Sequence, residues 1–457
     1  MTEPSRPGPP LRFPAPQLSA SVRAFVFDEA GSGAALLVAT VLALVWANSP
    51  WWESYFTFWQ ASVSIHLGDF AMDMDLRGLI NYGAMALFFM VLGLEISREL
   101  TSGELRDRRT VLVPAFGAIG GMLLPIGIYL IFNHGGEAVR GWGVVMSTDT
   151  AFLLGVLALF GPRCPDRLRL FLLTLAVVDD IGAIIVLAVA YTESLRLGPL
   201  IIAAVLVAAL GALRWNGVWR LTPYVIVAIF LWFAIYASGV HPTLAGVLVG
   251  LLIPARPTQP EVVQRLRVYG RALIERQTAQ RYRLAVLAAS ASVSANERLQ
   301  RALHPWSAFL VIPAFGLANA GVHLSPDVLR RAASSPVTIG IIVGLVVGNM
   351  VGITAASTIA LRAGLGELPG RVRYTHLLGG ATLAGMGFTI SLFITGLAFT
   401  SADLRDQAKI GILAGSLLAA VLGASVLRVM GNRSPLCSPE GDAPTALPPL
   451  PWTASSV

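Results

Sequence analysis

The most constraining feature of this 457-residue chain is the recurrence of apolar stretches about 20 residues long, bounded by Pro, Gly or Arg. A helix of that length crosses the hydrocarbon core of a bilayer, where only helices and closed barrels satisfy every backbone hydrogen bond. Charged residues make up 13% of the chain, about half the share in soluble domains. The sequence therefore predicts an all-α polytopic membrane protein, and it excludes a water-soluble globule, a collagen-like chain and a nucleic-acid-binding protein.

We interpret twelve stretches as membrane-spanning helices, and they divide the chain into three parts. A transmembrane domain over 28–430 is expected between disordered cytoplasmic tails over 1–27 and 431–457, which are rich in Pro, Ser and Ala. Two cysteines, Cys164 and Cys437, are too few for a disulfide framework or a thiolate metal site. The expected spans lie near 31–48, 79–98, 111–132, 142–160, 168–191, 198–213, 221–239, 242–254, 305–321, 336–361, 375–398 and 408–430.

Positive charge predicts the orientation of these spans. With both termini in the cytoplasm, 26 of the 33 Lys and Arg residues fall on the cytoplasmic side and 7 on the outer side. Basic residues favour the cytoplasmic ends of membrane helices. We therefore expect a multi-pass protein whose termini are both cytoplasmic and whose first partner is the lipid bilayer.

A small external β-hairpin is predicted within residues 63–76. Apolar and polar residues alternate from Val63 to Met72 around a Gly68-Asp69 turn, which is the period of a β-strand. Because a two-stranded hairpin is only marginally stable alone, we expect it to pair with a second copy of the chain in a homodimer. An irregular loop is the alternative interpretation.

The connection over 255–304 is unusually long and basic. Its apolar spacing predicts a surface amphipathic helix within Val262 to Ala295. The basic residues on this helix are Arg265, Arg267, Arg271 and Arg276. Such a helix can contact anionic lipid headgroups. The alternative is a solvated loop.

Carboxylates inside the predicted spans are the candidate ion-binding groups. Asp149 lies in the fourth span, and Asp179 and Asp180 are adjacent in the fifth. An acid at such depth costs at least about 2–3 kcal/mol on insertion scales, so it usually marks an ion or proton pathway. Adjacent helical residues point about 100° apart, so only one of the pair can face a given direction. The alternative is that these acids are paired internally for packing.

Two of the predicted spans contain residues that interrupt a helix. Poor helix formers surround Asp149 over 147–150, and the eleventh span contains glycines at 379–380 and within 385–387. In transporters, paired interrupted helices often mark an ion site near the midplane, where half-helix ends meet. Helix N-termini there would stabilise an acid through their dipoles. Glycine alone is weaker evidence, because membrane helices also use it for close packing.

A charged cluster lies toward the cytoplasmic end of the second span. Glu95, Arg98 and Glu99 follow one another at intervals of three and one, so they share a helix face. We interpret them as a proton antenna at the mouth of a funnel, with an ordinary interfacial ion cluster as the alternative. His241 and His304 each precede a proline and are interpreted as structural residues at span ends.

Taken together, the motifs resemble those of NhaA-type sodium/proton antiporters over about residues 28–430. The strongest are Thr148-Asp149-Thr-Ala-Phe152, continuing to Ala158, and Ala176-Val-Val-Asp179-Asp180-Ile-Gly-Ala-Ile184. Supporting motifs are Ala47-Asn48-Ser49, Gly93-Leu-Glu95, Ser238-Gly-Val-His241, Thr243-Leu-Ala-Gly246, Ala318-Asn319-Ala-Gly-Val322 and Gly387-Phe-Thr389. The order of the whole set makes the resemblance specific.

The resemblance implies a function that the residues alone leave open. It implies exchange of Na⁺ or Li⁺ for H⁺ across a bacterial plasma (inner) membrane, with the cation bound at Asp179 and Asp180. It also implies inverted repeats and activation by alkaline pH. Two broken helices are expected to cross at the midplane, and their residues would be Thr148, Asp149, Gly385, Gly387 and Thr389. No cofactor is implied beyond the transported ions, and no enzymatic activity is expected.

The chain departs from the family pattern at its ion site. A lysine that the resemblance places in the tenth span is Asn349 here. The single lysine, Lys409, lies near the outer end of the twelfth span, and an aspartate common in the second span is Tyr82. An amide can coordinate a cation but cannot supply a charge, so we expect weakened or alkaline-shifted exchange with a changed balance of charge moved.

The pH response is the second point of departure. The acid and histidine that the resemblance places before the ninth span are Gln300 and Arg301, whereas Arg298 and His304 are kept. The expected pH-responsive residues are therefore Glu95, Arg98, Glu99, Arg298 and His304. The cation preference, the stoichiometry and the pH profile stay open at this point.

Three other classes of function compete with an antiporter. An intramembrane aspartyl protease needs a Gly-x-Gly-Asp element, but Gly385-Met386-Gly387 is followed by Phe388. A sodium-coupled symporter of organic anions is disfavoured because no arginine converges with the buried acids. A transport-silent or altered-stoichiometry paralogue that acts as a regulator or sensor is the third alternative, which the loss of the lysine keeps open.

Overall fold

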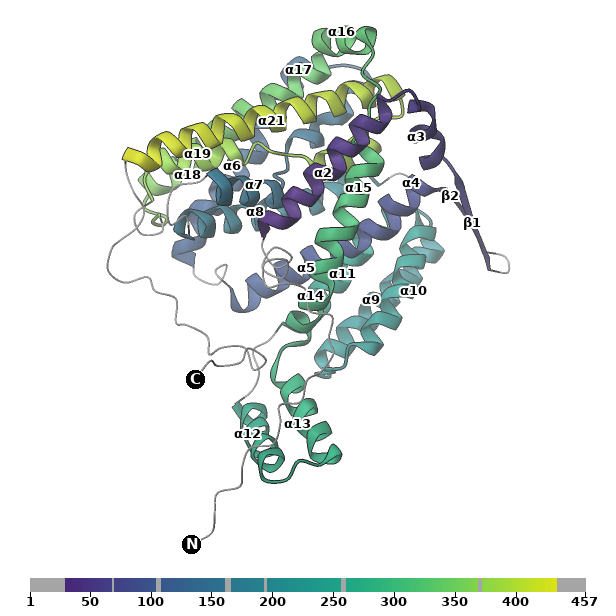
Figure 1. Ribbon diagram of the computed structural model, residues 1–457, viewed down its shortest axis with the longest axis vertical. Helices are drawn as coiled ribbons and strands as arrows, with labels where there is room; N and C mark the ends of the chain where they lie inside the picture. The colour runs from purple at the N-terminus through teal and green to yellow at the C-terminus, as the bar shows by residue number, and fades with distance from the viewer. Residues whose placement is uncertain are drawn as a thin grey trace.

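The structure is a computed structural model that describes residues 29–67, 70–103, 108–160, 166–192, 195–255, 260–368 and 372–433. It is almost entirely helical, with one small hairpin projecting from its side (Figure 1). The predicted tail over 1–27 lies outside the described residues, as does most of the tail over 431–457, of which 431–433 belong to the last helix.

The helices are named in chain order. The first half contains α2 (Glu29–Ala47), α3 (Trp52–Trp59), α4 (Leu76–Gly78), η1 (Leu79–Ala84), α5 (Met85–Ser102), α6 (Arg108–Phe132), η3 (Glu137–Val145), α7 (Thr150–Phe160), α8 (Asp166–Ala190), α9 (Leu197–Trp215), α10 (Thr222–Ser238) and α11 (Thr243–Leu252). The second half contains α12 (Pro260–Glu275), α13 (Ala279–Ser292), α14 (Ala295–Trp306), η4 (Ser307–Val311), α15 (Ile312–Asn319), α16 (Pro326–Ser334), α17 (Pro336–Val343), η5 (Gly344–Gly348), α18 (Asn349–Arg362), α19 (Tyr374–Leu383), α20 (Thr389–Ala398) and α21 (Ala402–Arg433).

Several helices have the length and composition of membrane spans. Among the described residues, six helical stretches are long and apolar enough: Leu76–Thr101, Val111–Phe132, Leu168–Ala190, Leu197–Trp215, Pro336–Arg362 and Ala402–Val429. A bent pair, Gly31–Ala47 with Trp52–Trp59, would make a seventh. The remaining predicted spans fall on shorter or interrupted helices, so the number twelve stays a prediction.

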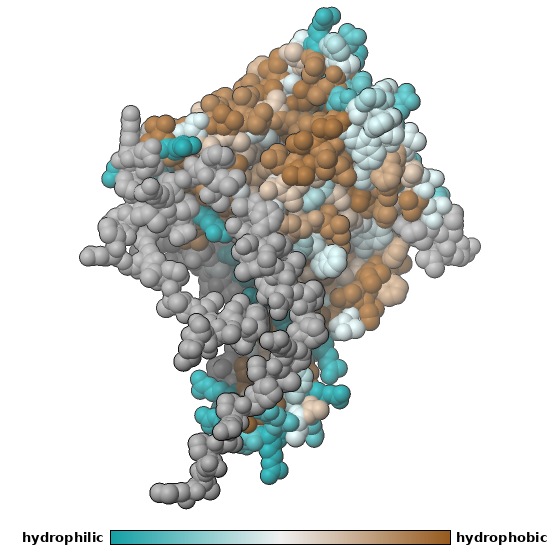
Figure 2. Space-filling model, viewed as in Figure 1, coloured by the Kyte–Doolittle hydropathy of each residue, from teal (hydrophilic) through white to brown (hydrophobic). Residues whose placement is uncertain are grey.

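The molecular surface has the character expected of a protein in lipid. Large apolar side chains point outward from α2 and α21, and Figure 2 shows a broad hydrophobic surface over these helices. Leu37 and Val45 of α2 are 53% and 62% exposed, and Leu417 of α21 is 66% exposed. Hydrocarbon chains rather than water suit such a surface.

The predicted β-hairpin is confirmed. Strands β1 (Ser62–Leu67) and β2 (Phe70–Asp75) pair antiparallel, with Val63 opposite Met74. The strands project away from the helical body (Figure 1). Whether they pair with a second copy of the chain stays a prediction.

The single amphipathic helix predicted within Val262 to Ala295 is wrong in its extent. The structure divides this segment into α12 and α13, and α14 begins at Ala295. Two hydroxyl side chains explain the breaks. Thr278 and Ser294 accept hydrogen bonds from the backbone N–H groups of Arg281 and Glu297, at 3.4 and 3.1 Å, and so start new helices. Sequence periodicity predicted one helix in this segment but neither of these caps.

A carboxylate connects the start of η3 to the loop between α20 and α21. Glu137 Oε1 accepts hydrogen bonds from Thr400 N and Oγ1 and from Ser401 N, the last two at 2.7 and 3.2 Å. The Thr400 hydroxyl, followed by the two backbone N–H groups, lowers the pKa of Glu137 below its usual 4.5. A lowered pKa means that the connection is complete above pH 4.5 and weakens as the pH falls below it.

Glu137→Gln is expected to loosen this connection at neutral pH and to remove its dependence on acid. The neutral amide forms weaker hydrogen bonds than the carboxylate. Hydrogen–deuterium exchange at 400–401, taken relative to the intrinsic amide exchange rate at each pH, should be severalfold faster in the variant. The loss of protection that we expect in the wild type below pH 4.5 should be absent from the variant. Glu53→Gln on α3 is the matched control. Equal exchange in wild type and Glu137→Gln would contradict the assignment.

Candidate ion-binding site

Two interrupted stretches of backbone contact each other inside the helical body. Residues 147–149 are not helical and precede α7, and residues 384–388 separate α19 from α20. Asp149 N donates to Met386 O at 2.6 Å, and Thr148 Oγ1 donates to Ala384 O at 2.8 Å. The predicted interruptions are therefore present, and they are in direct contact.

Glycine is needed where these stretches approach their neighbours. A Cβ atom on Gly385 would collide with the carbonyl oxygen of Leu345 in η5. One on Gly387 would lie 2.6 Å from the carbonyl oxygen of Ser147. The two glycines singled out from the sequence therefore allow the backbones to approach closely, but they have no side chain with which to bind an ion.

Asp149 joins the N-termini of two short helices. Its Oδ1 accepts from Phe152 N in α7 at 3.1 Å, and its Oδ2 accepts from Thr389 N and Oγ1 at the start of α20, at 3.0 and 2.7 Å. The side chain is 4% exposed. A carboxylate at two helix N-termini satisfies free N–H groups and complements both dipoles, as expected from the sequence.

The adjacent acids of α8 have different surroundings. Asp179 Oδ2 accepts from Thr148 N at 2.7 Å, so it supports the interrupted stretch before α7. Asp180 instead lines a cavity of about 140 Å³, and in the part of the chain that the structure describes it accepts no hydrogen bond from the protein. The two acids point in different directions, as the angle between neighbouring helix positions requires, but Asp179 is not on the wall of this cavity.

The Asp180 cavity brings together polar residues from six separate segments. Polar side chains on its wall are Ser32, Glu95, Thr148, Asp149, Thr150, Asp180, His304, Ser307 and Thr389. Glu95 and His304 were singled out for pH response, and they lie on the same wall as the acids. Sequence reasoning missed Ser32 and Ser307, which are 7% and 4% exposed. The only feature of the sequence that could have identified them is a hydroxyl side chain within an apolar stretch. Such side chains are too common to indicate an ion site.

Other predicted residues lie outside this wall. Arg98 contacts Glu99 at 3.2 Å and donates to Gln300 Oε1 at 3.1 Å. Arg298 Nη2 donates to the carbonyl oxygen of Trp219 at 2.5 Å, and its guanidinium lies over the Trp219 ring. These groups form a polar layer at the ends of α5 and α14.

Asn349 is also separate from the cavity wall. It is 1% exposed, and its Nδ2 donates to the carbonyl oxygen of Leu345 one turn earlier, at 3.2 Å. Lys409 lines a different cavity of about 450 Å³, together with Asp73, Asp75, Arg77, Asn81 and Arg405. Its Nζ donates to Gly321 O at 3.4 Å. The single lysine therefore does not reach the Asp180 cavity.

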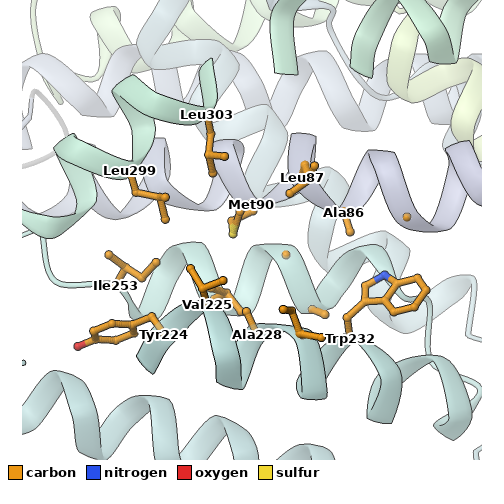
Figure 3. A pocket seen from close by; sticks show the side chains of 15 residues that line it. Ala86, Leu87, Met90, Tyr224, Val225, Ala228, Trp232, Ile253, Leu299 and Leu303 are labelled. Carbon is orange, nitrogen blue, oxygen red and sulfur yellow. The ribbon is translucent and has the colours of Figure 1, made fainter. Parts of the chain in front are cut away.

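A third cavity, of about 440 Å³, is unsuited to a bare ion. It lies between α5, α10, α11 and α14, and its wall is formed by apolar side chains such as Leu87, Met90 and Leu299 (Figure 3). The polar atoms of Tyr224 and Trp232 bond to carbonyl oxygens of Val218 and Tyr82. No acid lines this cavity, so it is not the candidate ion site.

Comparison with known proteins gives consistent matches. The family model described as Na⁺/H⁺ antiporter 1 matches residues 23–427. The protein named Na(+)/H(+) antiporter NhaA 3 of Frankia alni is 60% identical over 455 residues, covering 99% of this chain and 98% of that protein. Na(+)/H(+) antiporter NhaA of Rhodopirellula baltica is 44% identical over 420 residues, covering 88% and 92%. This chain covers only 66% of Na(+)/H(+) antiporter NhaA 1 of Mycolicibacterium vanbaalenii, at 43% identity.

Proposed function

Because the chain belongs to the Na⁺/H⁺ antiporter 1 family, a family of multi-pass membrane transporters, we propose that it exchanges Na⁺ or Li⁺ for H⁺ at the Asp179–Asp180 pair. The single observation that carries this proposal is the cavity that brings Asp180 and Asp149 together where two interrupted helices touch. Carboxylate and hydroxyl oxygens suit a hard cation, and the same oxygens bind protons. One site can therefore serve both ions in turn.

Each acid has its own role in the proposed site. Asp180 binds the cation or proton, because its oxygens face the cavity and take no hydrogen bond from the described residues. Asp179 supplies the second negative charge beside the bound cation, and it accepts a hydrogen bond from Thr148 N. Asp149 stabilises the two helix ends from which Thr148 and Thr389 offer hydroxyl oxygens. The protein supplies positioning, and no covalent step is needed.

Alternating access explains how both sides of the membrane reach one site. The Asp180 cavity extends toward Glu95 and His304, which lie on the cytoplasmic side in the proposed orientation. The cavity with Lys409 lies on the outer side and contains none of the three site aspartates. Transport then requires the aspartates to change their connection from one cavity to the other. This scheme includes twelve spans, inverted repeats and broken helices crossing at the midplane.

The proposal extends to regulation and assembly in the bacterial plasma membrane. Glu95, Arg98, Glu99, Arg298 and His304 are the proposed pH-responsive residues, and both termini are cytoplasmic. The polar layer at the ends of α5 and α14 supports this role, because Arg98 and Glu99 lie about one helical turn from Glu95, which lines the cavity. The hairpin over 63–76 is the proposed homodimer contact.

Cation-induced dequenching of a ΔpH dye in everted vesicles tests the function. Sodium and lithium are added in turn, from neutral to alkaline pH, to vesicles with and without the protein. An antiporter restores fluorescence on addition of either cation. No response from folded protein at any pH would favour a transport-silent regulator or sensor, while a response that requires an organic substrate would favour another cation-coupled transporter.

Asn349→Lys is expected to change the charge moved per turnover. In the wild type this buried position is neutral, and an ammonium there would add one titratable positive charge to the membrane interior. Currents on a solid-supported membrane, divided by the rate of exchange, measure the charge directly. Asn349→Gln is the matched control. Identical charge per turnover for wild type and Asn349→Lys across the pH range would contradict the idea.

A further inference from the structure

The helices α12 and α13 form a pair that stands apart from the helical body. Among the described elements, α12 and α13 make extensive contacts only with each other. Arg281 Nη1 of α13 donates to the carbonyl oxygen of Ala272 in α12 at 2.7 Å. Figure 1 shows the pair projecting from the lower end of the molecule. We call it the basic helical pair.

The apolar surface of this pair points outward. In α13 the small residues Ala285 and Ala288 are buried at 9% and 8% exposure. The large residues are exposed instead: Tyr282 60%, Leu284 38%, Val286 44% and Leu287 50%. A helix that meets only water buries its large apolar side chains. Of these residues, Tyr282, Val286 and Leu287 lie within about 140° of one another around α13, so they form an apolar face without a described protein partner.

The basic helical pair is rich in arginine. The pair carries Arg265, Arg267, Arg271, Arg281 and Arg283, with Arg276 between its helices. Its acids are Glu261 and Glu275, so the segment has an excess of four positive charges. Guanidinium groups form paired hydrogen bonds with phosphate oxygens, and an apolar face flanked by cations is typical of helices that lie at a membrane surface.

The connections at both ends keep the pair close to the bilayer. Seven residues, 253–259, join it to α11, and they can extend at most about 24 Å. Only Val293 and Ser294 separate it from α14, where Asn296 Nδ2 is anchored to the carbonyl oxygen of Leu94 at 2.9 Å. The cytoplasmic leaflet is therefore within reach of this segment in the proposed orientation.

We propose that the basic helical pair docks on the anionic headgroups of the cytoplasmic leaflet, with Tyr282, Val286 and Leu287 in the boundary between headgroups and acyl chains. The arginines bind lipid phosphates, and the apolar face of α13 leaves water. This docking requires the basic helical pair to lie on the cytoplasmic side, as in the proposed orientation, but it does not require ion exchange. It gives the transporter a contact that senses the anionic lipid content of its own membrane.

A fluorescent label at position 286 tests the dock in the full chain. The label NBD is attached to Val286→Cys after Cys164 and Cys437 are replaced by alanine. The protein is reconstituted into vesicles of phosphatidylcholine alone or of equal parts phosphatidylcholine and phosphatidylglycerol. Docking predicts a blue-shifted emission that doxyl lipids quench, and only with phosphatidylglycerol. Exchange activity measured on the same vesicles separates a failed dock from a failed transporter.

Charge variants provide the control. Arg265→Gln, Arg267→Gln and Arg271→Gln together should lower the ratio of docked to free states roughly a hundredfold, because each basic residue near an anionic surface contributes about fivefold. Arg330→Gln with Arg331→Gln on α16, at the outer side, should leave the signal unchanged. Emission equal in both lipid mixtures would overturn the proposal. So would a blue shift without lipid quenching, because it would indicate a protein segment on this face.

Discussion

Asp180→Asn is expected to abolish sodium- and lithium-induced dequenching, down to the level of vesicles without the protein. The variant keeps the size of the side chain but removes the charge that faces the cavity. A buried site that loses its anionic ligand can no longer offset the cost of dehydrating Na⁺. The variant also lacks the group that we propose to carry the proton. Asp179→Asn should give the same loss of exchange while its amide oxygen still accepts from Thr148 N.

Asp327→Asn on α16 is the matched control for this experiment, because its acid lies on a surface helix outside the proposed site. Correct folding is checked by elution of each variant as a single species after purification. Exchange that persists in Asp180→Asn at any pH would remove this residue from the ion site. Loss only in Asp179→Asn would exchange the roles that the geometry assigns to the two acids.

Asp149→Ala is expected to cause the largest loss of stability in the transmembrane domain. It leaves Phe152 N, Thr389 N and Thr389 Oγ1 buried without their acceptor. Each buried donor that loses its acceptor costs about 1–3 kcal/mol. The midpoint of thermal unfolding in detergent should therefore fall clearly, and exchange should be lost because α7 and α20 are no longer held together.

Thr389→Ser is the control for this prediction, since it keeps the hydroxyl that donates to Asp149. Its unfolding midpoint should stay close to that of the wild type. The unfolding midpoint of Asp149→Asn should lie between those of Asp149→Ala and Thr389→Ser. Its NH₂ group would face an N–H donor at the position of one carboxylate oxygen. An Asp149→Ala protein as stable as the wild type would show that the three hydrogen bonds contribute little.

The interruptions were predictable because their causes are local. Poor helix formers around Asp149 and the glycines at 385 and 387 weaken a helix wherever it lies. The hairpin was predictable for the same reason, since its alternation and its turn are contained in one short segment. The break at Thr278 was missed because a single threonine is a weak signal until its side chain is seen to cap Arg281 N.

The sequence by itself determined that the protein lies in a membrane, to which family it belongs and which acids are buried. The reason is that span length, charge and the order of the motifs are properties of the chain alone. Only the tertiary structure decided which acid faces the cavity. Asp179 and Asp180 are adjacent residues of the same type, so the sequence does not distinguish them. Packing of α8 against the stretch before α7 places Asp179 against Thr148 and leaves Asp180 facing the cavity. It also brought Ser32 and Ser307 to the same wall, since residues so far apart in sequence meet only when the helices pack.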